Sequence, residues 1–459
     1  MAPHAPSAIR AVVALATTLG LAVAPSSADA TAKHVILISI DTLRADHVGA
    51  YGSKDVKTPF IDAFASESVL FSNAYTASTM TLPSHITMFT GLFAHNHGVP
   101  WNGAVVPKEN VMLAEHFSDA GFSTAAFIGG NPMGKSTGIN QGFQLYPGVI
   151  EDPDARLQRT FEWVETHKEQ QMFLFVHLWE AHWPYHPPAP YDRMYRTDDT
   201  PVTGTFDEII KLRKDYKTKV AGAQERSDVM KNLYKGGVTY TDKVFGDLIE
   251  GLRAQGVLDD SLVILVSDHG ESTDEHFDVW THGATAYNTN AQIPFIVRLP
   301  NQARKGTVVD DRVSLIDLAP TVLEELGQPP FAKVDGVSLS KALHGKGTIA
   351  ERTLYVEAPL PRNDPDPSMT WINENKCAAV IVGDLKLHRC PNWKKLELFE
   401  ISKDPDETTN LAKKPEMTSA MTELQANLDR WRAAGADKAL EIDTDEDTIN
   451  ALKELGYME

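Results

Sequence analysis

The chain has 459 residues, 42% of them hydrophobic and 23% charged, which is ordinary for a folded globular protein. Its length allows one large α/β domain, alone or with a smaller appendage. With 62 acidic against 43 basic residues, the formal net charge of −19 argues against binding a polyanion such as nucleic acid.

The first thirty residues have the pattern of an export signal. Arg10 precedes an apolar run of small residues from Ala11 to Ala24, and Ala28-Asp29-Ala30 matches a cleavage site. The run is short for a membrane span, and no other stretch approaches that length. We therefore predict a signal peptide over residues 1–30 and an exported protein, periplasmic or extracellular, with no stable membrane span. The alternative is an uncleaved anchor or a disordered tail.

Apolar runs of strand length alternate with helical patterns along the chain. The predicted strands are Val35–Ile40, Ser123–Ile128, Phe173–His177, Leu262–Val266 and Pro294–Leu299. The predicted helices are Leu113–Asp119, Ala155–Glu165 and Tyr234–Arg253. Because near-continuous apolar strands are buried on both faces, this alternation predicts an α/β fold in which helices cover both faces of a sheet.

Changes in composition divide the chain. Residues 187–227 are polar and irregular, which suits an insertion or a lid near a site. A Pro- and Asp-rich stretch at 359–367 precedes a predicted strand at 378–382 and an amphipathic helix around 417–431. We predict a main α/β domain over residues 31–358 and a C-terminal subdomain over residues 359–459.

Residues that can bind a cation stand after two of the predicted strands. Asp41 follows Val35–Ile40, and Asp268 with His269 comes just beyond Leu262–Val266. In α/β sheets ligands bind at the carboxyl ends of strands, so these side chains can converge on one site. Carboxylates and an imidazole suit Mn²⁺, Mg²⁺ or Zn²⁺ better than Ca²⁺.

A hydroxyl residue lies in the Pro-marked stretch Thr81-Leu82-Pro83-Ser84-His85. Beside a bound cation, the Thr81 hydroxyl is a candidate nucleophile. The alternative is that Thr81 and Ser84 only start a helix, since a capping hydroxyl needs no catalytic role.

Two further groups of residues leave alternatives open. The histidines His177, His182 and His186 either belong to the site or form a solvated loop that binds metals weakly. Cys377 and Cys390 are the only cysteines, and in an oxidising compartment they could form a disulfide worth about 3 kcal/mol. Their spacing alone does not decide whether they pair.

Taken together, these motifs resemble the sulfatase branch of the alkaline phosphatase superfamily from about Lys33 to the C-terminus. The stretches that carry the resemblance are Asp41-Thr-Leu-Arg-Ala-Asp46, Pro83-Ser84-His85 with Thr90-Gly91-Leu92, His182-Trp-Pro-Tyr185, Ser267-Asp-His-Gly-Glu271 and His282-Gly283. The resemblance implies a large mixed sheet sandwiched by helices and a smaller C-terminal α+β subdomain. It also implies one divalent metal ion (Ca, Mn, Mg or Zn).

The resemblance implies a role for individual residues. The implied metal ligands are Asp41, Thr81, Asp268 and His269. The implied catalytic residues are Thr81 as nucleophile, His182 facing the leaving group, and His282 where a lysine or histidine usually lies. The implied substrate contacts are Asn102, His85 and Asn131.

The chain departs from the sulfatase pattern at several positions. Sulfatases carry a cysteine or serine that is oxidised to formylglycine, followed four residues later by arginine, and here Thr81 and His85 stand at these places. Threonine cannot give that aldehyde by the usual oxidation. Thr42 stands where a second acidic residue often follows Asp41, so the metal site has one charge fewer.

These departures bear on the substrate. A sulfate ester on threonine would be a sluggish intermediate, whereas a phosphate or phosphonate ester on threonine suits a metal site. We therefore predict an exported sulfatase-family hydrolase of sulfate or phosphate/phosphonate esters, acting on a small-molecule, glycan or lipid ester. The alternatives are a phosphodiester-dependent group transferase, a pseudoenzyme that binds glycan or lipid head groups, and a structural exported protein. The oligomeric state is not readable.

Overall fold

The computed structural model describes residues 32–197, 200–277, 279–360 and 375–435. The predicted signal peptide and most of the stretch 359–367 lie outside the described residues. No helix among these residues is long and apolar enough to cross a membrane.

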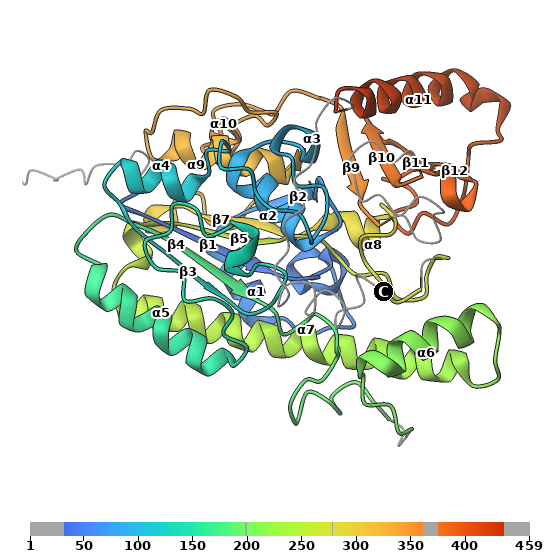
Figure 1. The fold of residues 1–459 in the computed structure, drawn as a ribbon, viewed down its shortest axis with the longest axis horizontal. Coiled ribbons are helices and arrows are strands. Elements are labelled where there is room, and N and C mark those ends of the chain that lie inside the picture. The colour runs from blue at the N-terminus through green and yellow to red at the C-terminus, as the bar shows by residue number, and fades with distance from the viewer. Residues whose placement is uncertain (1–31, 198–199, 278, 361–374, 436–459) are drawn as a thin grey trace, which may run out of the picture.

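A large mixed sheet forms the centre of the molecule (Figure 1). Its strands are β1 (His34–Ile40), β2 (Val69–Tyr75), β3 (Ser123–Ile128), β4 (Met172–Leu178), β5 (Ser261–Ser267), β6 (Gln292–Ile293), β7 (Phe295–Arg298) and β8 (Thr307–Ser314). The order is β3-β4-β1-β5-β7-β2-β6, and β8 pairs with β2. Strands β3, β4, β1 and β5 are mutually parallel, whereas β7 runs antiparallel to both β5 and β2.

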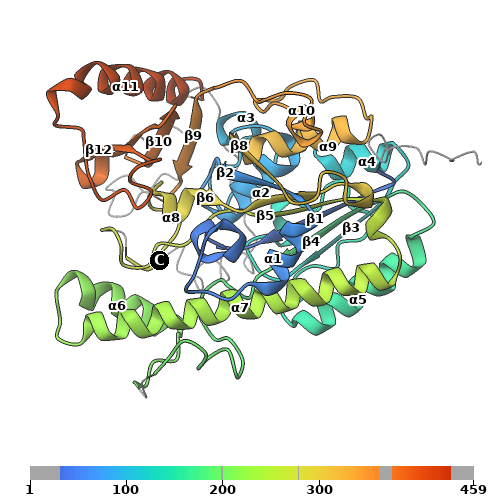
Figure 2. The ribbon, with the colours of Figure 1, turned by 180° about the vertical axis from the view of Figure 1, so that it is seen from behind.

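Helices cover both faces of this sheet, as the apolar strands predicted. The α-helices among the described residues are α1 (Pro59–Ser66), α2 (Thr81–Thr90), α3 (Ala94–His97), α4 (Leu113–Asp119), α5 (Pro153–His167), α6 (Phe206–Lys217), α7 (Ala223–Ala254), α8 (Asn288–Ala291), α9 (Leu318–Glu325), α10 (Ser340–Leu343) and α11 (Thr418–Ala433). Figures 1 and 2 show α5 and α7 on one side of the sheet and α2, α4 and α9 on the other.

Strand β1 explains why the strands are apolar throughout. Val35 and Leu37 belong to the core that contains Phe89 of α2. Ile36 and Ile38, at the alternate positions, belong to the core that faces α1, α5 and α7. Because side chains alternate along a strand, a strand buried on both sides has no polar face.

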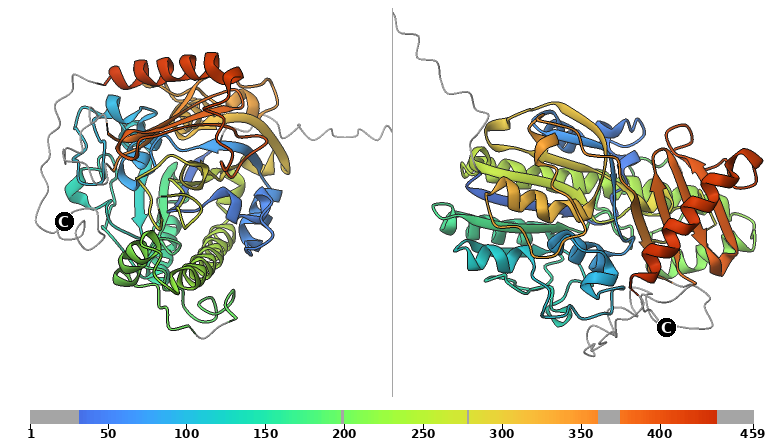
Figure 3. Two further views of the ribbon diagram at one scale, coloured as in Figure 1. Left: turned by 90° about the vertical axis from the view of Figure 1, so that its right-hand side faces the viewer. Right: turned by 90° about the horizontal axis from the view of Figure 1, so that it is seen from above.

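A smaller antiparallel sheet follows, made of β9 (Leu354–Ala358), β10 (Cys377–Val382), β11 (Leu385–Cys390) and β12 (Lys395–Glu400). Helix α11 lies along one face of it, and its Leu424 and Leu428 share a core with Val380 (Figure 3). Strand β9 pairs with β10, so this sheet begins at Leu354, a few residues before the predicted boundary at 359.

The segment 187–227 is more regular than its polar composition suggested. It contains helix α6 and the first turns of α7, which begins at Ala223 instead of within the predicted stretch 234–253. Buried Ile209 and Leu212 give α6 an apolar face against the core that also contains Val229 of α7. Polar residues cover the outer faces of such a hairpin and hide its helical period.

The two cysteines form a disulfide. Cys377 at the start of β10 and Cys390 at the end of β11 are joined across the two antiparallel strands. Both residues are fully buried, and the bond closes a short loop within the small sheet. The structure therefore settles the pairing that the spacing left open.

Candidate active site

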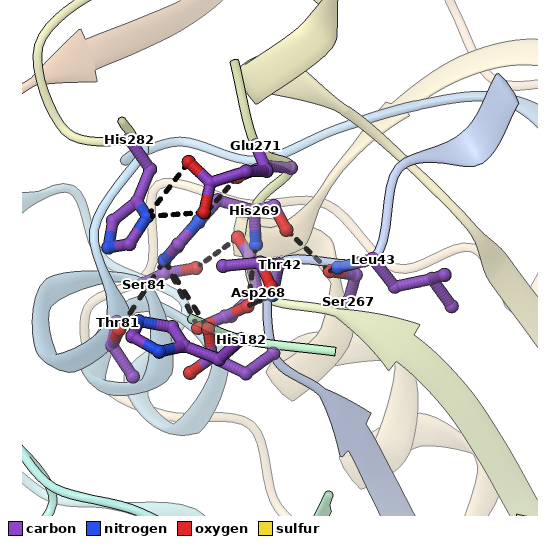
Figure 4. A network of polar contacts seen from close by, with 12 residues as sticks. Thr42, Leu43, Thr81, Ser84, His182, Ser267, Asp268, His269, Glu271 and His282 are labelled. Carbon is purple, nitrogen blue, oxygen red and sulfur yellow. Dashed lines mark hydrogen bonds and ion pairs between the residues drawn. The ribbon is translucent and has the colours of Figure 1, made fainter. Parts of the chain in front are cut away.

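The residues predicted to bind a cation converge at the carboxyl ends of β1 and β5. These strands are neighbours in the sheet, and Ile40 pairs with Ser267, so Asp41 and Asp268 follow at the same level. Both carboxylates and the His269 imidazole are fully buried. One ligand atom from each of Asp41, Asp268 and His269 lies within 4.8 Å of the others. Figure 4 shows Asp268 and His269 among the surrounding side chains.

The unpaired atoms of this cluster fit a divalent cation. Oδ1 of Asp41 and Oδ2 of Asp268 are buried and have no hydrogen-bond partner among the described residues. Nδ1 of His269 donates to the carbonyl of Gly270 at 2.9 Å, which leaves the Nε2 lone pair facing the carboxylates. Nε2 lies 3.5 Å from Asp268 Oδ2 and 4.0 Å from Asp41 Oδ1. Carboxylate oxygens and an imidazole nitrogen form a usual donor set for such an ion.

The raised pKa values of the two carboxyl groups also favour a bound cation. Burial raises the pKa of Asp41 to about 7. Burial, and then the nearby charge of Asp41, raises the pKa of Asp268. Two carboxylates this close and this deeply buried are stable as anions only beside a positive charge. A cation held by both would supply that charge.

Thr81 begins helix α2 and directs its hydroxyl at this cluster. Its Oγ1 lies 3.4 Å from Nε2 of His269 (Figure 4). The N-cap of the helix is Met80, which makes no side-chain capping bond. Ser84, one turn along, donates its hydroxyl to the carbonyl of Asp268 at 2.8 Å. Both hydroxyls therefore contact the end of β5, and neither is merely a helix cap.

Asn102 lies beside the start of the same helix. Its Oδ1 accepts a hydrogen bond from the backbone N–H of Leu82 at 2.9 Å. Its Nδ2 is buried and has no hydrogen-bond partner among the described residues. A fixed amide with an unused donor next to Thr81 can bind an oxygen of a substrate.

The histidines His177, His182 and His186, in and after β4, lie in different environments, and together they do not form a solvated loop. Nε2 of His177 lies 3.2 Å from Asp41 Oδ2, with both side chains fully buried. His182 is 2% exposed, its Nδ1 donates to the carbonyl of Trp183, and its Nε2 has no partner among the described residues. His186 is exposed.

His182 is held between aromatic side chains. Its ring stacks on that of Trp179, with centroids 3.7 Å apart and planes inclined by 23°. Its ring centroid is 5.1 Å from that of His282. Burial, and then the neighbouring His282, holds the pKa of His182 well below its usual value, so the imidazole is neutral in the free protein.

His282 lies over His269, the candidate metal ligand. Its ring centroid is 4.6 Å from that of His269. Nδ1 of His282 lies 3.3 and 3.2 Å from the two carboxylate oxygens of Glu271 (Figure 4). Burial raises the pKa of Glu271 to about 7. Glu271 therefore orients the ring of His282.

The structure places His85 and Asn131, the other predicted substrate contacts, on different sides of the cluster. His85 is fully buried, and its ring nitrogens lie 2.8 Å from the Thr81 carbonyl and 3.0 Å from Ser39 Oγ. The protein itself thus engages both nitrogens of His85, which makes it a support for Thr81. Asn131 instead lines a cavity of about 500 Å³ that His182 also lines.

Sequence reasoning gave no role to several side chains of the site. The sequence left open whether His177 belongs to the site, although it lies at the end of the apolar run of β4, and its partner Asp41 directly follows β1. Glu271 ends the motif Ser267-Asp-His-Gly-Glu271, and its place two residues after His269 was the sequence signal for it. Nothing in the local pattern of Trp179 indicated that its ring would stack on His182.

Comparison of the chain with known proteins identifies its family. The sequence model of the sulfatase family matches residues 33–328. A second model, described as N-sulphoglucosamine sulphohydrolase, C-terminal, matches residues 279–434. An arylsulfatase of Clostridium perfringens is 24% identical over 451 residues, which cover 82% of this chain and 90% of that protein.

Two further relatives carry other names. The multifunctional alkaline phosphatase superfamily protein PehA of Trinickia caryophylli is 23% identical over 508 residues, covering 89% of this chain and 97% of the relative. The crystal structure of the phosphonate monoester hydrolase of Agrobacterium radiobacter has the same fold, with a TM-score of 0.69 and 20% identity, covering 90% of this chain and all of that one. The chain belongs to the sulfatase family of ester hydrolases.

Proposed function

We propose that this chain is an exported, metal-dependent hydrolase of phosphate, phosphonate or sulfate esters in which Thr81 is the nucleophile. One observation carries the proposal. The buried Thr81 hydroxyl lies 3.4 Å from His269, inside a cluster whose Asp41 and Asp268 each have a carboxylate oxygen without a partner among the described residues. Such a hydroxyl is placed to attack an anionic ester bound at the same cation.

The ligands of that cation would be Asp41, Asp268, His269 and the Thr81 hydroxyl. When bound, a divalent ion lowers the pKa of a ligated hydroxyl and offsets the negative charge of the ester. Asn102 would donate its unused amide hydrogens to a nonbridging oxygen of the ester, stabilising charge that develops during transfer.

His182 and solvent account for the proton transfers. The Thr81 hydroxyl releases its proton to solvent, and its oxygen forms a bond to phosphorus or sulfur as the bond to the leaving oxygen breaks. His182, protonated from solvent once an anionic ester lies beside Nε2, gives that proton to the leaving oxygen. Water then attacks the threonine ester, giving its hydroxyl to phosphorus or sulfur and its other proton to His182. The Thr81 oxygen leaves and takes a proton from solvent, while His182 returns its proton to solvent. The net reaction adds one water across the ester bond.

Threonine favours phosphorus over sulfur as the reacting centre. The hydroxyl of Thr81 cannot become a formylglycine aldehyde by the usual oxidation, so release of sulfate by elimination is not open to it. Hydrolysis of a threonine phosphate or phosphonate ester is the easier second step. The phosphonate monoester hydrolase among the structural relatives is consistent with this choice, although its likeness shows only a shared fold.

Export is supported by two features of the chain. The apolar stretch from Ala11 to Ala24 and the Ala28-Asp29-Ala30 sequence suit a signal peptide. The disulfide between Cys377 and Cys390 suits an oxidising compartment. A periplasmic or extracellular protein would meet both conditions.

The test compares the wild-type protein with Thr81→Ala and Thr81→Ser, each supplied with Mn²⁺, Mg²⁺, Ca²⁺ or Zn²⁺. The substrates are 4-nitrophenyl sulfate, 4-nitrophenyl phosphate, bis(4-nitrophenyl) phosphate and 4-nitrophenyl phenylphosphonate. We expect phosphorus esters to be cleaved, with a loss of about a thousandfold or more in Thr81→Ala and partial activity in Thr81→Ser. Thr166→Ala, at an exposed position of helix α5 whose hydroxyl donates to the carbonyl of Glu162, is the control and should behave like wild type.

Other outcomes separate the alternatives. Sulfate turnover that survives in Thr81→Ala would mean that water attacks directly, and Thr81 would not be the nucleophile. Transfer of the phosphoryl group to an added alcohol in preference to water would identify a transferase. Cation binding without turnover of any ester would favour a binding protein.

A further inference from the structure

The cavity beside His182 opens over a different part of the sheet from the metal-ligand cluster. Asp41 and Asp268 follow β1 and β5, whereas the cavity is lined by Asn131 and Trp179, which follow β3 and β4. In the strand order β3-β4-β1-β5, it therefore lies to the β3 side of the reacting centre. Its volume of about 500 Å³ falls in the range of small-molecule sites.

His182 joins the two regions. It lines the cavity, is 2% exposed, and its Nε2 has no partner among the described residues. The hydrogen bond from Nδ1 to the Trp183 carbonyl and the stacking on Trp179 fix the ring. A leaving oxygen that takes a proton from this ring must lie beside His182, and the cavity that His182 lines is the adjoining space for the rest of the alcohol, which makes this cavity the place of the leaving alcohol.

The cavity wall is acidic. Glu180 and Glu151 both line it. The charge of Glu180 is balanced from behind by the fully buried Arg156, which also donates to the carbonyl of Ile150 at 2.8 Å. Glu151 is exposed, and its carboxylate has no ion-pair partner among the described residues.

The negative charge of the cavity wall affects the pKa of a further lining residue, Tyr240. Tyr240 of α7 also lines the cavity, and its pKa is raised by burial and then by Glu180 and Asp154. Lys243 of the same helix acts in the opposite direction on the pKa of Tyr240, and its ammonium is paired with Asp247. The cavity thus offers carboxylates, an amide, two histidines and aromatic rings, and neither a lysine nor an arginine among the described residues lines it.

We propose that this cavity receives an uncharged or cationic leaving group, such as a neutral or amino-bearing alcohol, and discriminates against leaving groups that carry a further anionic group. The inference rests on the proposed ester hydrolysis and specifies its substrate. A second anion would lie against Glu151 and Glu180, and in the described part of the chain neither a lysine nor an arginine lines the cavity to pair with it. A neutral or cationic alcohol can accept hydrogen bonds from Asn131 and Tyr240 or donate to the carboxylates.

The test uses esters that differ only in the charge of the leaving group. Phenols with a 2-aminoethyl, 2-hydroxyethyl or 2-carboxyethyl group in the para position are similar in reactivity, because the saturated spacer insulates the ring. Each is esterified with the acid that the wild-type protein cleaves best. We expect kcat/KM for the carboxylate substrate to be about tenfold or more below that of the ammonium substrate, the size of one charge contact near a surface.

Two variants with the same change of charge, one inside the cavity and one outside it, make the test more specific. Glu151→Lys should reduce the preference for the ammonium substrate at least severalfold or reverse it. Glu169→Lys makes the same change of charge at an exposed residue outside the cavity and should leave the ratio unchanged. Equal kcat/KM for the three substrates, or equal effects of both variants, would overturn the proposal.

A calorimetric titration with the three free phenols separates the inference from the reaction. If no ester is cleaved, the proposed hydrolysis fails while the binding order still reports on the cavity. Preferential binding of the aminoethyl phenol, abolished in Glu151→Lys but not in Glu169→Lys, supports the inference. Equal binding of the carboxyethyl phenol contradicts it.

Discussion

The hydroxyl oxygen of Thr81 lies 3.4 Å from Nε2 of His269, although 188 residues separate them in the sequence. The contact exists because α2 starts next to the end of β5, where Ser84 donates its hydroxyl to the carbonyl of Asp268. One turn of helix thus carries both the candidate nucleophile and the anchor that holds it against Asp41, Asp268 and His269, the candidate metal ligands.

Ser84→Ala should weaken this anchor. The variant loses the bond to Asp268 at 2.8 Å and the contact with Thr76 Oγ1 at 3.1 Å, so we expect about 1–2 kcal/mol less stability and an activity loss of about tenfold. Urea unfolding and kcat measure these effects. The control Ser66→Ala removes an exposed hydroxyl bound to Ala63 and should change neither quantity. Identical behaviour of the two variants would show that the anchor does not position Thr81.

His177→Phe should weaken cation binding. Nε2 of His177 lies 3.2 Å from Oδ2 of Asp41, and partners that orient a metal ligand typically contribute 10–100-fold to affinity, so we expect a loss of about that size. Titration with Mn²⁺ followed by calorimetry measures the effect without turnover. His186→Phe, at the exposed histidine of the same segment, is the control. Unchanged affinity in His177→Phe would mean that Asp41 needs no such partner.

Gly130→Ala should disturb His182 through Trp179. A Cβ at residue 130 would lie 2.2 Å from an atom of the Trp179 ring, so the indole must move and its stacking on His182 must change. We expect kcat to fall about tenfold or more while cation affinity is kept. Gly134→Ala is the matched control, because its Cβ would meet nothing closer than 3.6 Å. Similar kcat in both variants would exclude a positioning role for Trp179.

Asp242 should make stability depend on pH. It is 1% exposed and accepts hydrogen bonds from the backbone N–H groups of Phe60 and Ile61 at the start of α1. Burial raises its pKa from 3.8 to about 7. Between about pH 4 and pH 7 the carboxyl group of Asp242 is therefore protonated in the folded protein and ionised in the unfolded chain. The proton on Asp242 therefore stabilises the folded protein fully below about pH 4, and this contribution is lost as the pH rises through 7.

The measurement is urea unfolding of wild type and Asp242→Asn at pH 5 and pH 8, with the same cation present. The stability of wild type should fall by roughly 3 kcal/mol more than that of the variant between these two values. The difference between the proteins isolates Asp242 from other buried acids. Parallel pH profiles would mean that Asp242 is ionised in the folded protein throughout this range.

Local patterns determined much of the fold. Runs such as Val35–Ile40 and Leu262–Val266 are apolar at every position, which is enough to predict strands between two layers of helices. Asp41, Asp268 and His269 could be placed together because the carboxyl ends of parallel strands share one edge of a sheet. Helix α6 escaped prediction because its outer face is polar and only Ile209 and Leu212 mark the buried side.

The sequence by itself determined the central strands β1, β3, β4, β5 and β7, the helices α4, α5 and α11 with the second half of α7, and the convergence of a carboxylate pair with an imidazole. Only the tertiary structure decided which way the other side chains face. It placed His85 beneath Thr81, brought His177 to Asp41, and set His182 between the reacting centre and a cavity. The contact of His177 with Asp41 depends on the pairing of β4 with β1, which brings together residues 136 apart in the sequence. The periodicity of a single segment shows which of its faces is buried, but it does not show which other segment packs against that face.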